Sequence, residues 1–288
     1  MATVIVPPAE NTRRPGWITQ LRLPVLLALS FIGVIVLIPI VTLLYLTFTT
    51  SSPTADAAWY ERFSLEQFRI LFGQVDYWRY ASNSLTVSLV YTIPAVFSSM
   101  LAGYAFARLR ARGSNILFAI VIATMLVPLF VYLVPLFVIY SRLGMTNTVL
   151  PWLLWGLGGN AFYIFLFRQF FDAFPSEIED AAMLDGLNRW GIFVRVIIPN
   201  SYTPIATVSI LAFTGVWGEY LVQNVLLFND SAATLSVRLG AGVIDPTGTV
   251  LLLPATLAGI FLYLIPPVLM FIVFQRQIVQ GSATSGMK

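Results

Sequence analysis

Polar residues inside an apolar stretch are the first candidates for chemistry in this chain of 288 residues. Glu219 and Gln223 lie four residues apart, with Trp217 and Asn224 beside them, in a run that is otherwise apolar from 202 to 228. This spacing places Glu219 and Gln223 on one face of a helix. A carboxylate and amides near an indole can bind a ligand rich in hydroxyl groups, by hydrogen bonds and ring stacking. A polar contact with another subunit explains the same residues equally well.

Asn160 is a second candidate for a ligand pathway, because it is an amide within another apolar run. It follows Gly158 and Gly159, and small residues with a single amide more often serve close helix packing. Asn83 and Ser84, where a further apolar run begins, are most simply interpreted as residues at the start of a helix.

The segment 175–199, PSEIEDAAMLDGLNRWGIFVRVIIP, is a polar island between apolar runs. Ser176 can cap a helix while Glu179, three residues later, reaches back to the cap. We therefore expect a first helix that begins near Glu177.

A turn and a second helix are predicted to follow. Gly186 can adopt the left-handed conformation that ends helices, and Asn188 can cap a second helix that runs toward Pro199. Ala181 and Ala182 are small enough to let a partner approach the first helix closely. The pattern predicts a docking element, although a solvated helical loop would have the same composition.

Composition indicates a membrane protein. Hydrophobic residues make up 58% of the chain and charged residues 10%, whereas soluble domains have about 25% charged residues; the mean hydropathy is +0.84. The chain has no cysteine and no histidine, which excludes disulfides, thiolate chemistry and imidazole metal sites. The net charge of +3 comes from arginines at the edges of apolar runs, so nucleic-acid binding has no support.

Six runs are long enough to cross a bilayer, which takes about 20 apolar residues. We predict an all-α integral membrane protein with a polar tail at 1–22, a six-helix transmembrane domain at 23–274 and a polar tail at 275–288. The predicted spans lie at about 23–48, 83–107, 116–140, 149–171, 202–228 and 250–274. The loop 49–82 is rich in aromatic residues, which suits an interfacial belt with short amphipathic helices.

Arg13 and Arg14 precede the first apolar run and resemble an export signal. The run after them is too long for a signal-peptide core and lacks an A-x-A cleavage site, so we predict that it is retained as the first span.

Orientation follows from the distribution of basic residues, because cytoplasmic loops carry more Lys and Arg. Placing the N-terminus inside assigns eleven of the sixteen basic residues to cytoplasmic segments and five to outer ones. With six spans, both termini and the segment 175–199 are then cytoplasmic.

The sequence contains no evident reaction centre. It has no GxxxxGK[ST] loop for nucleotide phosphates. The acidic residues Glu177, Glu179, Asp180 and Asp185 gather on one helix without a second cluster that could complete a metal site or an acid/base pair. We therefore predict a chain that is not an enzyme and holds no cofactor or metal.

The segment 175–199 resembles the signature loop of ABC importer permeases. That motif consists of E-A-A, a glycine after three further residues, and I-x-L-P after nine more. The chain has Asp180-Ala181-Ala182, then Gly186, then Val196-x-Ile198-Pro199 at the same spacing, with Asp for Glu, Val for Ile and Ile for Leu. FSLEQFRILF at 63–72, PLFVIYSRLGMTNT at 135–148 and WGEYL at 217–221 are similar to the sugar-type branch. The resemblance covers nearly the whole chain after residue 24.

The resemblance implies a permease subunit of a carbohydrate importer with the type I importer fold, in a bacterial or archaeal cell (inner) membrane. Its expected partners are a sister permease, two ATP-binding subunits that hold ATP and Mg, and an extracytoplasmic sugar-binding protein. Residues implied to contact the ATPase are Glu179, Asp180, Ala181, Ala182, Met183, Leu184, Asp185, Gly186 and Pro199.

Three alternatives remain at this level. The chain could be a secondary transporter driven by an ion through Glu219, although we find no inverted repeat and no second buried acid. It could be an importer permease for a polyol, glycerol phosphate or another solute that is not a sugar. A structural membrane protein is the third alternative.

Overall fold

The computed structural model describes residues 22–49, 63–109 and 111–285. These residues are mostly helical and contain no strand, only two isolated β-bridges. The helices are α2 Arg22–Thr47, α3 Glu66–Gln74, α4 Tyr77–Arg108, α5 Ser114–Ala123, α6 Leu129–Arg142, α7 Leu150–Gly158, α8 Ala161–Ala173, α9 Ser176–Leu184, α10 Arg189–Ile192, α11 Ile198–Asn200, α12 Tyr202–Trp217, α13 Leu221–Leu226, α14 Leu235–Gly240, α15 Leu253–Tyr263 and α16 Ile265–Ser285. The predicted tail 1–22 lies almost entirely outside the described residues, as do residues 50–62 of the aromatic loop.

Helix α4 is the centre of the bundle and packs against α7, α8 and α12. Glycine permits two of these contacts. A Cβ on Gly103 of α4 would lie 2.6 Å from the Cβ of Phe167 on α8, and one on Gly156 of α7 would lie 2.7 Å from the carbonyl oxygen of Tyr91. Because real Cβ atoms do not approach so closely, these two glycines let α7 and α8 lie directly against α4.

Four helical segments are long and apolar enough to cross a membrane, and two bent helix pairs raise the number to six if each pair is one span. The four segments are Pro24–Thr47, Tyr77–Arg108, Leu150–Ala173 and Leu253–Gln275, and the bent pairs are Ser114–Leu126 with Leu129–Arg142 and Arg189–Asn200 with Tyr202–Trp217. The helix that contains the second predicted span begins at Tyr77, six residues before Asn83, because Asp76 accepts a hydrogen bond from the main chain of Arg79 and caps the helix.

The predicted span 116–140 is sharply bent, since α5 and α6 meet at an angle of 93°. Pro128 lies at the break, preceded by Val127 in an extended conformation. A residue before proline is disfavoured in the α region, which ends the first helix there. Pro135, the other proline of this segment, lies inside α6.

The predicted span 202–228 is also broken, because α12 ends at Trp217 and α13 begins at Leu221. Between α7 and α8 a smaller break occurs at Gly159, whose φ is +73°. These predicted spans therefore consist of two shorter helices each.

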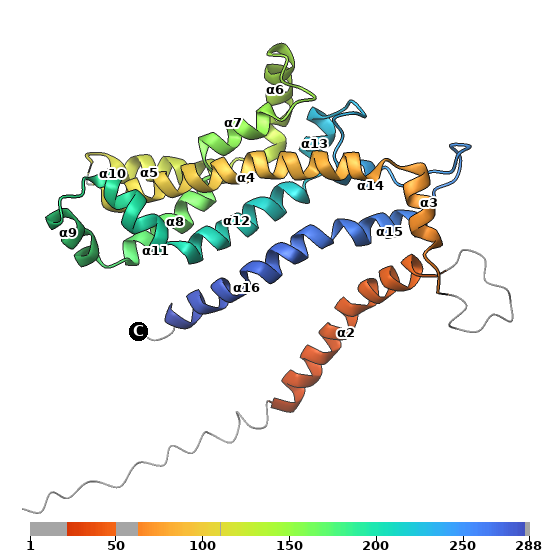
Figure 1. The fold of residues 1–288 in the computed structure, drawn as a ribbon, viewed down its shortest axis with the longest axis horizontal. Helices are drawn as coiled ribbons and strands as arrows, with labels where there is room; N and C mark the ends of the chain where they lie inside the picture. The colour runs from red at the N-terminus through yellow and green to blue at the C-terminus, as the bar shows by residue number, and fades with distance from the viewer. Residues whose placement is uncertain (1–21, 50–62, 110, 286–288) are drawn as a thin grey trace, which may run out of the picture.

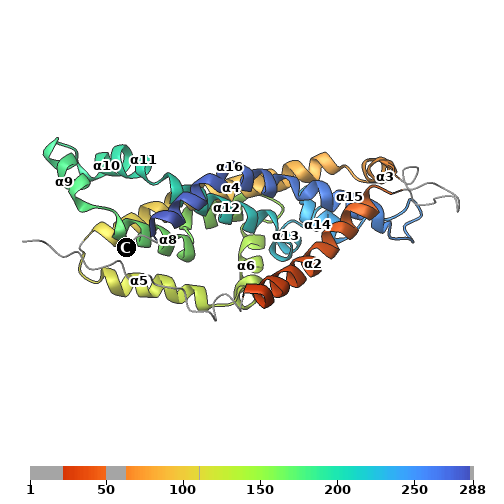
Figure 2. The ribbon, with the colours of Figure 1, turned by 90° about the horizontal axis from the view of Figure 1, so that it is seen from below.

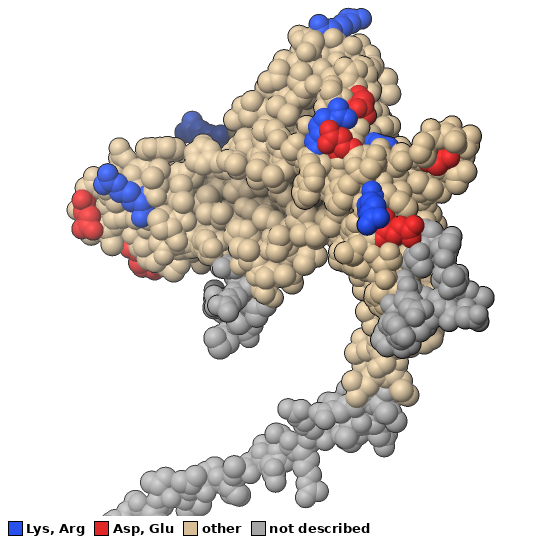
Figure 3. Space-filling view, turned by 45° about the vertical axis from the view of Figure 1, so that its right-hand side comes forward, with Lys and Arg blue, Asp and Glu red and all other residues tan. Residues whose placement is uncertain are grey.

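Opposite ends of the bundle carry different elements (Figures 1 and 2). Helices α9 to α11 and the end of α16 lie at one end, whereas α3 and α15 meet at the other. Charged side chains in view gather toward the two ends, with uncharged surface between them (Figure 3). Large apolar side chains of α2 are also exposed, such as Phe31 at 68%. An uncharged band between two charged ends is the arrangement that a bilayer requires.

Candidate functional site

The segment 175–199 folds as the predicted helix, glycine turn and helix. Helix α9 ends at Leu184, and Gly186 has a φ of +85°. Its N–H donates to the carbonyl of Met183, and that of Leu187 to the carbonyl of Ala182. The side chain of Asn188 accepts a hydrogen bond of 2.7 Å from Gly191 and caps α10, as the sequence predicts.

The second helix of this segment widens before it ends. Residues Phe193–Ile197 form a π-helical turn, in which the N–H of Ile198 donates to the carbonyl of Phe193. Pro199 has no N–H for the carbonyl of Arg195, and its ring crowds that carbonyl, so a regular α-helix cannot continue unchanged through this point.

The predicted capping box at the start of α9 is wrong. Pro175 occupies the cap position, Ser176 is the first helical residue, and no side chain caps the helix. Glu179 points inward instead and is 4% exposed. Its Oε1 lies 2.8 Å from Nε of Arg108, and its Oε2 accepts a hydrogen bond of 3.1 Å from the hydroxyl of Tyr104. The ion pair accounts for the orientation of Glu179, since a buried carboxylate needs a partner.

The residues expected to contact a partner divide into two sets. Glu179 and Ala182 face the interior of this chain, where Ala182 packs among the aromatic residues of one core cluster. The others are exposed: Asp180, Ala181, Met183, Leu184, Asp185, Gly186 and Pro199. Leu184 is 90% exposed, with Met183 at 40% beside it and Ile178 at 43% on the same helix. A cavity of ≈ 570 Å³ opens next to this helix, lined in part by Arg108, Asp180 and Arg189. This geometry suits docking rather than catalysis.

Glu219 lies at the break between α12 and α13, and its carboxylate caps the second helix. Oε1 accepts a hydrogen bond of 2.7 Å from the main chain of Val222, and Oε2 one of 2.9 Å from Gln223. Because the helix is interrupted at Glu219, the expected shared helical face with Gln223 is not present. The side chain of Gln223 is 1% exposed and bonds Val216 and Ser236.

Trp217 is likewise held by its own chain. The indole Nε1 donates to the carbonyl of Tyr263 at 3.0 Å, and the Tyr263 hydroxyl donates to the carbonyl of Trp217. The ring stacks with Phe213 and Tyr263 and is 3% exposed. It offers no open face to a ligand in this conformation. Asn224, by contrast, is exposed, and Glu219 is half-buried.

Asn160 caps α8, where its side-chain oxygen accepts hydrogen bonds from Phe162 and Tyr163. Its own N–H donates to the hydroxyl of Ser99 on α4. The packing interpretation of Asn160 therefore fits its contacts, although a role in a ligand pathway stays a prediction. In the described part of the chain no group of three or more Asp and Glu residues could hold a metal ion.

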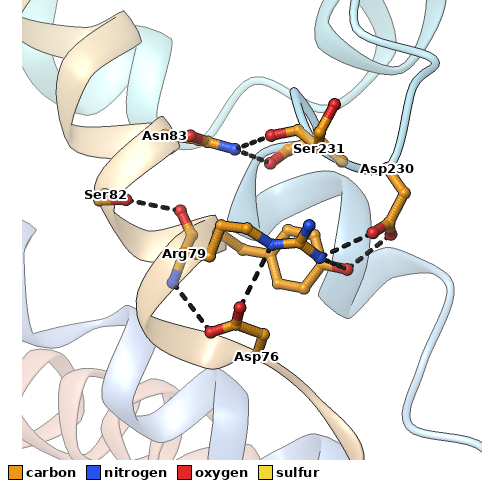
Figure 4. A network of polar contacts seen from close by, with 8 residues as sticks. Asp76, Arg79, Ser82, Asn83, Asp230 and Ser231 are labelled. Atoms are coloured by element: carbon orange, nitrogen blue, oxygen red, sulfur yellow. Dashed lines mark hydrogen bonds and ion pairs between the residues drawn. The ribbon is translucent and has the colours of Figure 1, made fainter.

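A polar network at the opposite end of α4 was missed by sequence reasoning (Figure 4). A guanidinium nitrogen of Arg79 lies 2.6 Å from Asp230, and the hydroxyl of Tyr80 donates to the same carboxylate at 2.6 Å. Asn83 donates to the carbonyls of Ser231 and Ala233 at 2.9 Å each. Asn83 therefore lies inside α4 and holds a distant loop, which corrects its assignment as a residue at the start of the helix.

Ser84, the next residue along α4, makes a similar contact. Its hydroxyl accepts a hydrogen bond of 2.8 Å from the main chain of Leu235. No motif signals these pairings, because the partners are about 150 residues apart. The pKa of the Asp230 carboxyl is lowered, chiefly by the hydrogen bond from Tyr80 and then by that from Arg79.

Comparison with known proteins gives consistent results. Residues 95–279 match the family described as "Binding-protein-dependent transport system inner membrane component". The lactose transport system permease LacG of Rhizobium radiobacter is 32% identical over 213 residues, which covers 73% of this chain and 76% of the relative. The arabinooligosaccharides permease AraQ of Halalkalibacterium halodurans is 30% identical over 78% of this chain and 80% of its own.

A solved structure shows the same fold. It is a chain of a bacterial ABC transporter involved in the import of the acidic polysaccharide alginate, with a TM-score of 0.75 and 22% identity. The match covers 92% of this chain and 98% of the other, so the two chains share the arrangement of helices described above.

Proposed function

The chain belongs to the family of binding-protein-dependent inner membrane components of ABC transporters, and from this we propose that it is one permease subunit of an ATP-driven sugar importer. It forms half of the translocation pathway and couples to ATPase subunits through residues 175–199. The single observation that carries the proposal is the family match. Helix α9 supports it, because among the residues that the structure describes Leu184 stays 90% exposed.

The names of relatives support a sugar as the substrate. Besides the lactose and arabinooligosaccharide permeases, the alpha-glucoside permease AglG of Rhizobium meliloti is 29% identical over 79% of this chain and 61% of its own. The proposed substrate class is therefore a mono- or oligosaccharide. The transported sugar enters from an extracytoplasmic binding protein and passes between this chain and a sister permease.

The proposed topology has six spans with both termini in the cytoplasm. Each bent helix pair is then one span, and the segment 175–199 interrupts the bundle on the cytoplasmic side. The excess of Lys and Arg in the segments assigned to that side supports this orientation. The same assignment places α3 and the loop 229–249 on the outer side, where the binding protein would meet them.

In the proposed mechanism the ATPase subunits hold ATP and Mg, and this chain holds neither. Closure of those subunits displaces α9, and the displacement rocks the spans so that the cavity between the two permeases opens outward. The exposed apolar residues Ile178, Met183 and Leu184 supply the docking surface, because their burial against a partner is favourable.

The substrate pathway is proposed to include Glu219 and Asn224, whose side chains are not fully covered. A carboxylate oxygen that already accepts one N–H can accept a further hydrogen bond from a sugar hydroxyl. The structure gives other roles to three of the candidates, because their polar groups form hydrogen bonds within this chain. Trp217 and Gln223 stabilise the break between α12 and α13, and Asn160 caps the start of α8.

Reconstitution into proteoliposomes tests the class of transporter. The complex that co-purifies with the chain should take up a labelled sugar when ATP and Mg are supplied, and should not respond to an ion gradient alone. Uptake by the isolated chain under an ion gradient would instead identify a secondary transporter. ATP-driven uptake of a polyol or glycerol phosphate, with no competition by sugars, would contradict the substrate class.

A further inference from the structure

An inward-facing ion pair joins α9 to the end of α4. Glu179 and Arg108 have side chains 6% and 16% exposed, and Nε and Oε1 are 2.8 Å apart. At this distance the guanidinium and the carboxylate form a direct ion pair. Tyr104, one turn before Arg108 on α4, donates to the other oxygen of the carboxylate. Two residues of α4 therefore hold one residue of α9.

The surroundings strengthen this junction. A guanidinium nitrogen of Arg108 also donates to the carbonyl of Phe174, two residues before α9 begins. Ala182 lies three residues after Glu179, hence on the same face of the helix, and packs in the core cluster that contains Tyr104 and Phe193. The inward face of α9 is therefore joined to α4 by charge and by packing, while Leu184 on the helix is 90% exposed among the described residues.

Helix α4 is well placed to carry a displacement away from α9. It packs against three neighbouring helices, and its other end holds the loop after α13 through Arg79, Tyr80 and Asn83 (Figure 4). Its 32 residues correspond to a length of about 48 Å. One helix thus connects the docking segment with the opposite face of the molecule.

We propose that Glu179 and Arg108 are positioning residues that fasten the docking helix to α4, so that α9 and α4 move as one body during transport. The proposal rests on the proposed function, because it concerns how docking at the outward face of α9 reaches the spans. A buried ion pair is suited to this task, since removing one partner leaves an uncompensated charge and frees the junction.

Charge variants provide the first test, with the sugar transported per ATP hydrolysed as the readout. Glu179→Gln keeps the shape and an oxygen for Tyr104 but removes the charge, and we expect it to lower this ratio about ten-fold or more while ATP hydrolysis continues. The double variant Arg108→Glu with Glu179→Arg should recover a large part of the ratio. Asp172→Asn is the matched control, because its ion pair with Arg168 lies within α8; it should leave the ratio unchanged.

A reversible crosslink provides the second test, and it leaves Glu179 and Arg108 unchanged. The chain has no cysteine, so Ala107→Cys on α4 and Ser176→Cys at the start of α9, which line the same cavity, can be joined by a short reducible crosslinker. If α9 and α4 move as one body, the crosslinked complex should retain most of its ATP-driven uptake. The two single-cysteine variants control for modification alone.

The outcomes separate this inference from the proposed function. Loss of uptake on crosslinking, with assembly and ATP hydrolysis retained and with recovery on reduction, would overturn the one-body proposal. An unchanged ratio in Glu179→Gln would overturn the role of the ion pair. Failure of the unmodified complex to transport a sugar with ATP would contradict the proposed function itself.

Discussion

The carboxylate of Glu219 accepts a hydrogen bond of 2.9 Å from the main chain of Gln223. Glu219 also accepts a hydrogen bond from the main chain of Val222. The two bonds cap α13 directly after α12 ends, within a stretch whose sequence predicts a single span. An acidic side chain in such a segment is costly unless it has partners. Here the two N–H groups at the start of α13 are those partners, so Glu219 stabilises the break.

Replacing Glu219 should separate its capping role from a pathway role. Glu219→Ala removes the acceptor for two N–H groups, and loss of a cap costs about 1 kcal/mol, which thermal unfolding in detergent can measure. Glu219→Gln keeps one acceptor oxygen and should lose less stability. If Glu219 also lines the pathway, both variants should lower uptake with the complex still assembled, whereas loss of assembly alone would favour a contact with the sister subunit.

Asn224→Ala is the comparison for Glu219. The side chain of Asn224 is exposed and caps no helix, so the substitution should leave the unfolding temperature unchanged. We expect reduced uptake, seen as a higher sugar concentration for half-maximal transport. Unchanged uptake would remove Asn224 from the pathway.

Gly186→Val should damage coupling. The φ of +85° is unfavourable for any side chain, by about 1–2 kcal/mol, and a β-branched residue fits it worst. Nothing lies within 4 Å of the added Cβ, so the effect comes from the backbone rather than from a clash. Measured ATP hydrolysis should then continue without proportional uptake, or the complex should fail to assemble.

Gly33→Val is the matched control for this variant, because Gly33 has the same open surroundings without the positive φ. It should assemble and transport normally. Normal uptake and normal complex yield in Gly186→Val would contradict a coupling role for the turn.

Leu184→Asp should weaken binding of the ATPase subunits while leaving the permease folded. Leu184 is 90% exposed, and burying a leucine side chain contributes about 1.5–3 kcal/mol. The dissociation constant should rise about 10- to 100-fold, measured with the purified subunits. Leu143→Asp, at a position that is 61% exposed after α6, is the control and should leave the dissociation constant unchanged.

The contact between Arg79 and Asp230 should weaken in acid. The pKa of Asp230 is lowered from 3.8 in the folded chain, so its contribution is present above that value and is lost as the pH falls through the lower, folded pKa. A spin label on Ser231→Cys should therefore become more mobile only below about pH 3.8. The same label in Asp230→Asn should be mobile at every pH; an identical acid transition in that variant would show that Asp230 is not responsible.

Much of the candidate docking site could be predicted from the sequence, because its signals are local. Gly186 and Asn188 specify their turn and cap through their own backbone chemistry, and both behave as predicted. Glu179 could not be assigned correctly, since a capping box and an inward ion pair require the same residue type. Its partner Arg108 is distant in the sequence, and only folding brings the two together.

The breaks in the spans show a second limit. Hydropathy identifies apolar stretches but does not locate breaks within them. At one break the carboxylate of Glu219 accepts main-chain hydrogen bonds in place of a carbonyl, and at another Pro128 turns the chain. The network around Asp230 is a third case, because its contacts join residues about 150 positions apart. The turn at Gly186 and the cap at Asn188 were predictable from local spacing, whereas the pairings of Glu179 and Asp230 depend on tertiary contacts and were not.

The most direct test of the central claim is a photo-crosslink from position 184 in native membranes. A photoreactive amino acid in place of Leu184 should form a covalent product with an ATP-binding subunit, and the same group at position 143 should not. A product of that kind at 184 would establish that the loop 175–199 meets the ATPase. Crosslinking of position 184 to lipid or to no protein, in a complex that still takes up sugar with ATP, would contradict the account.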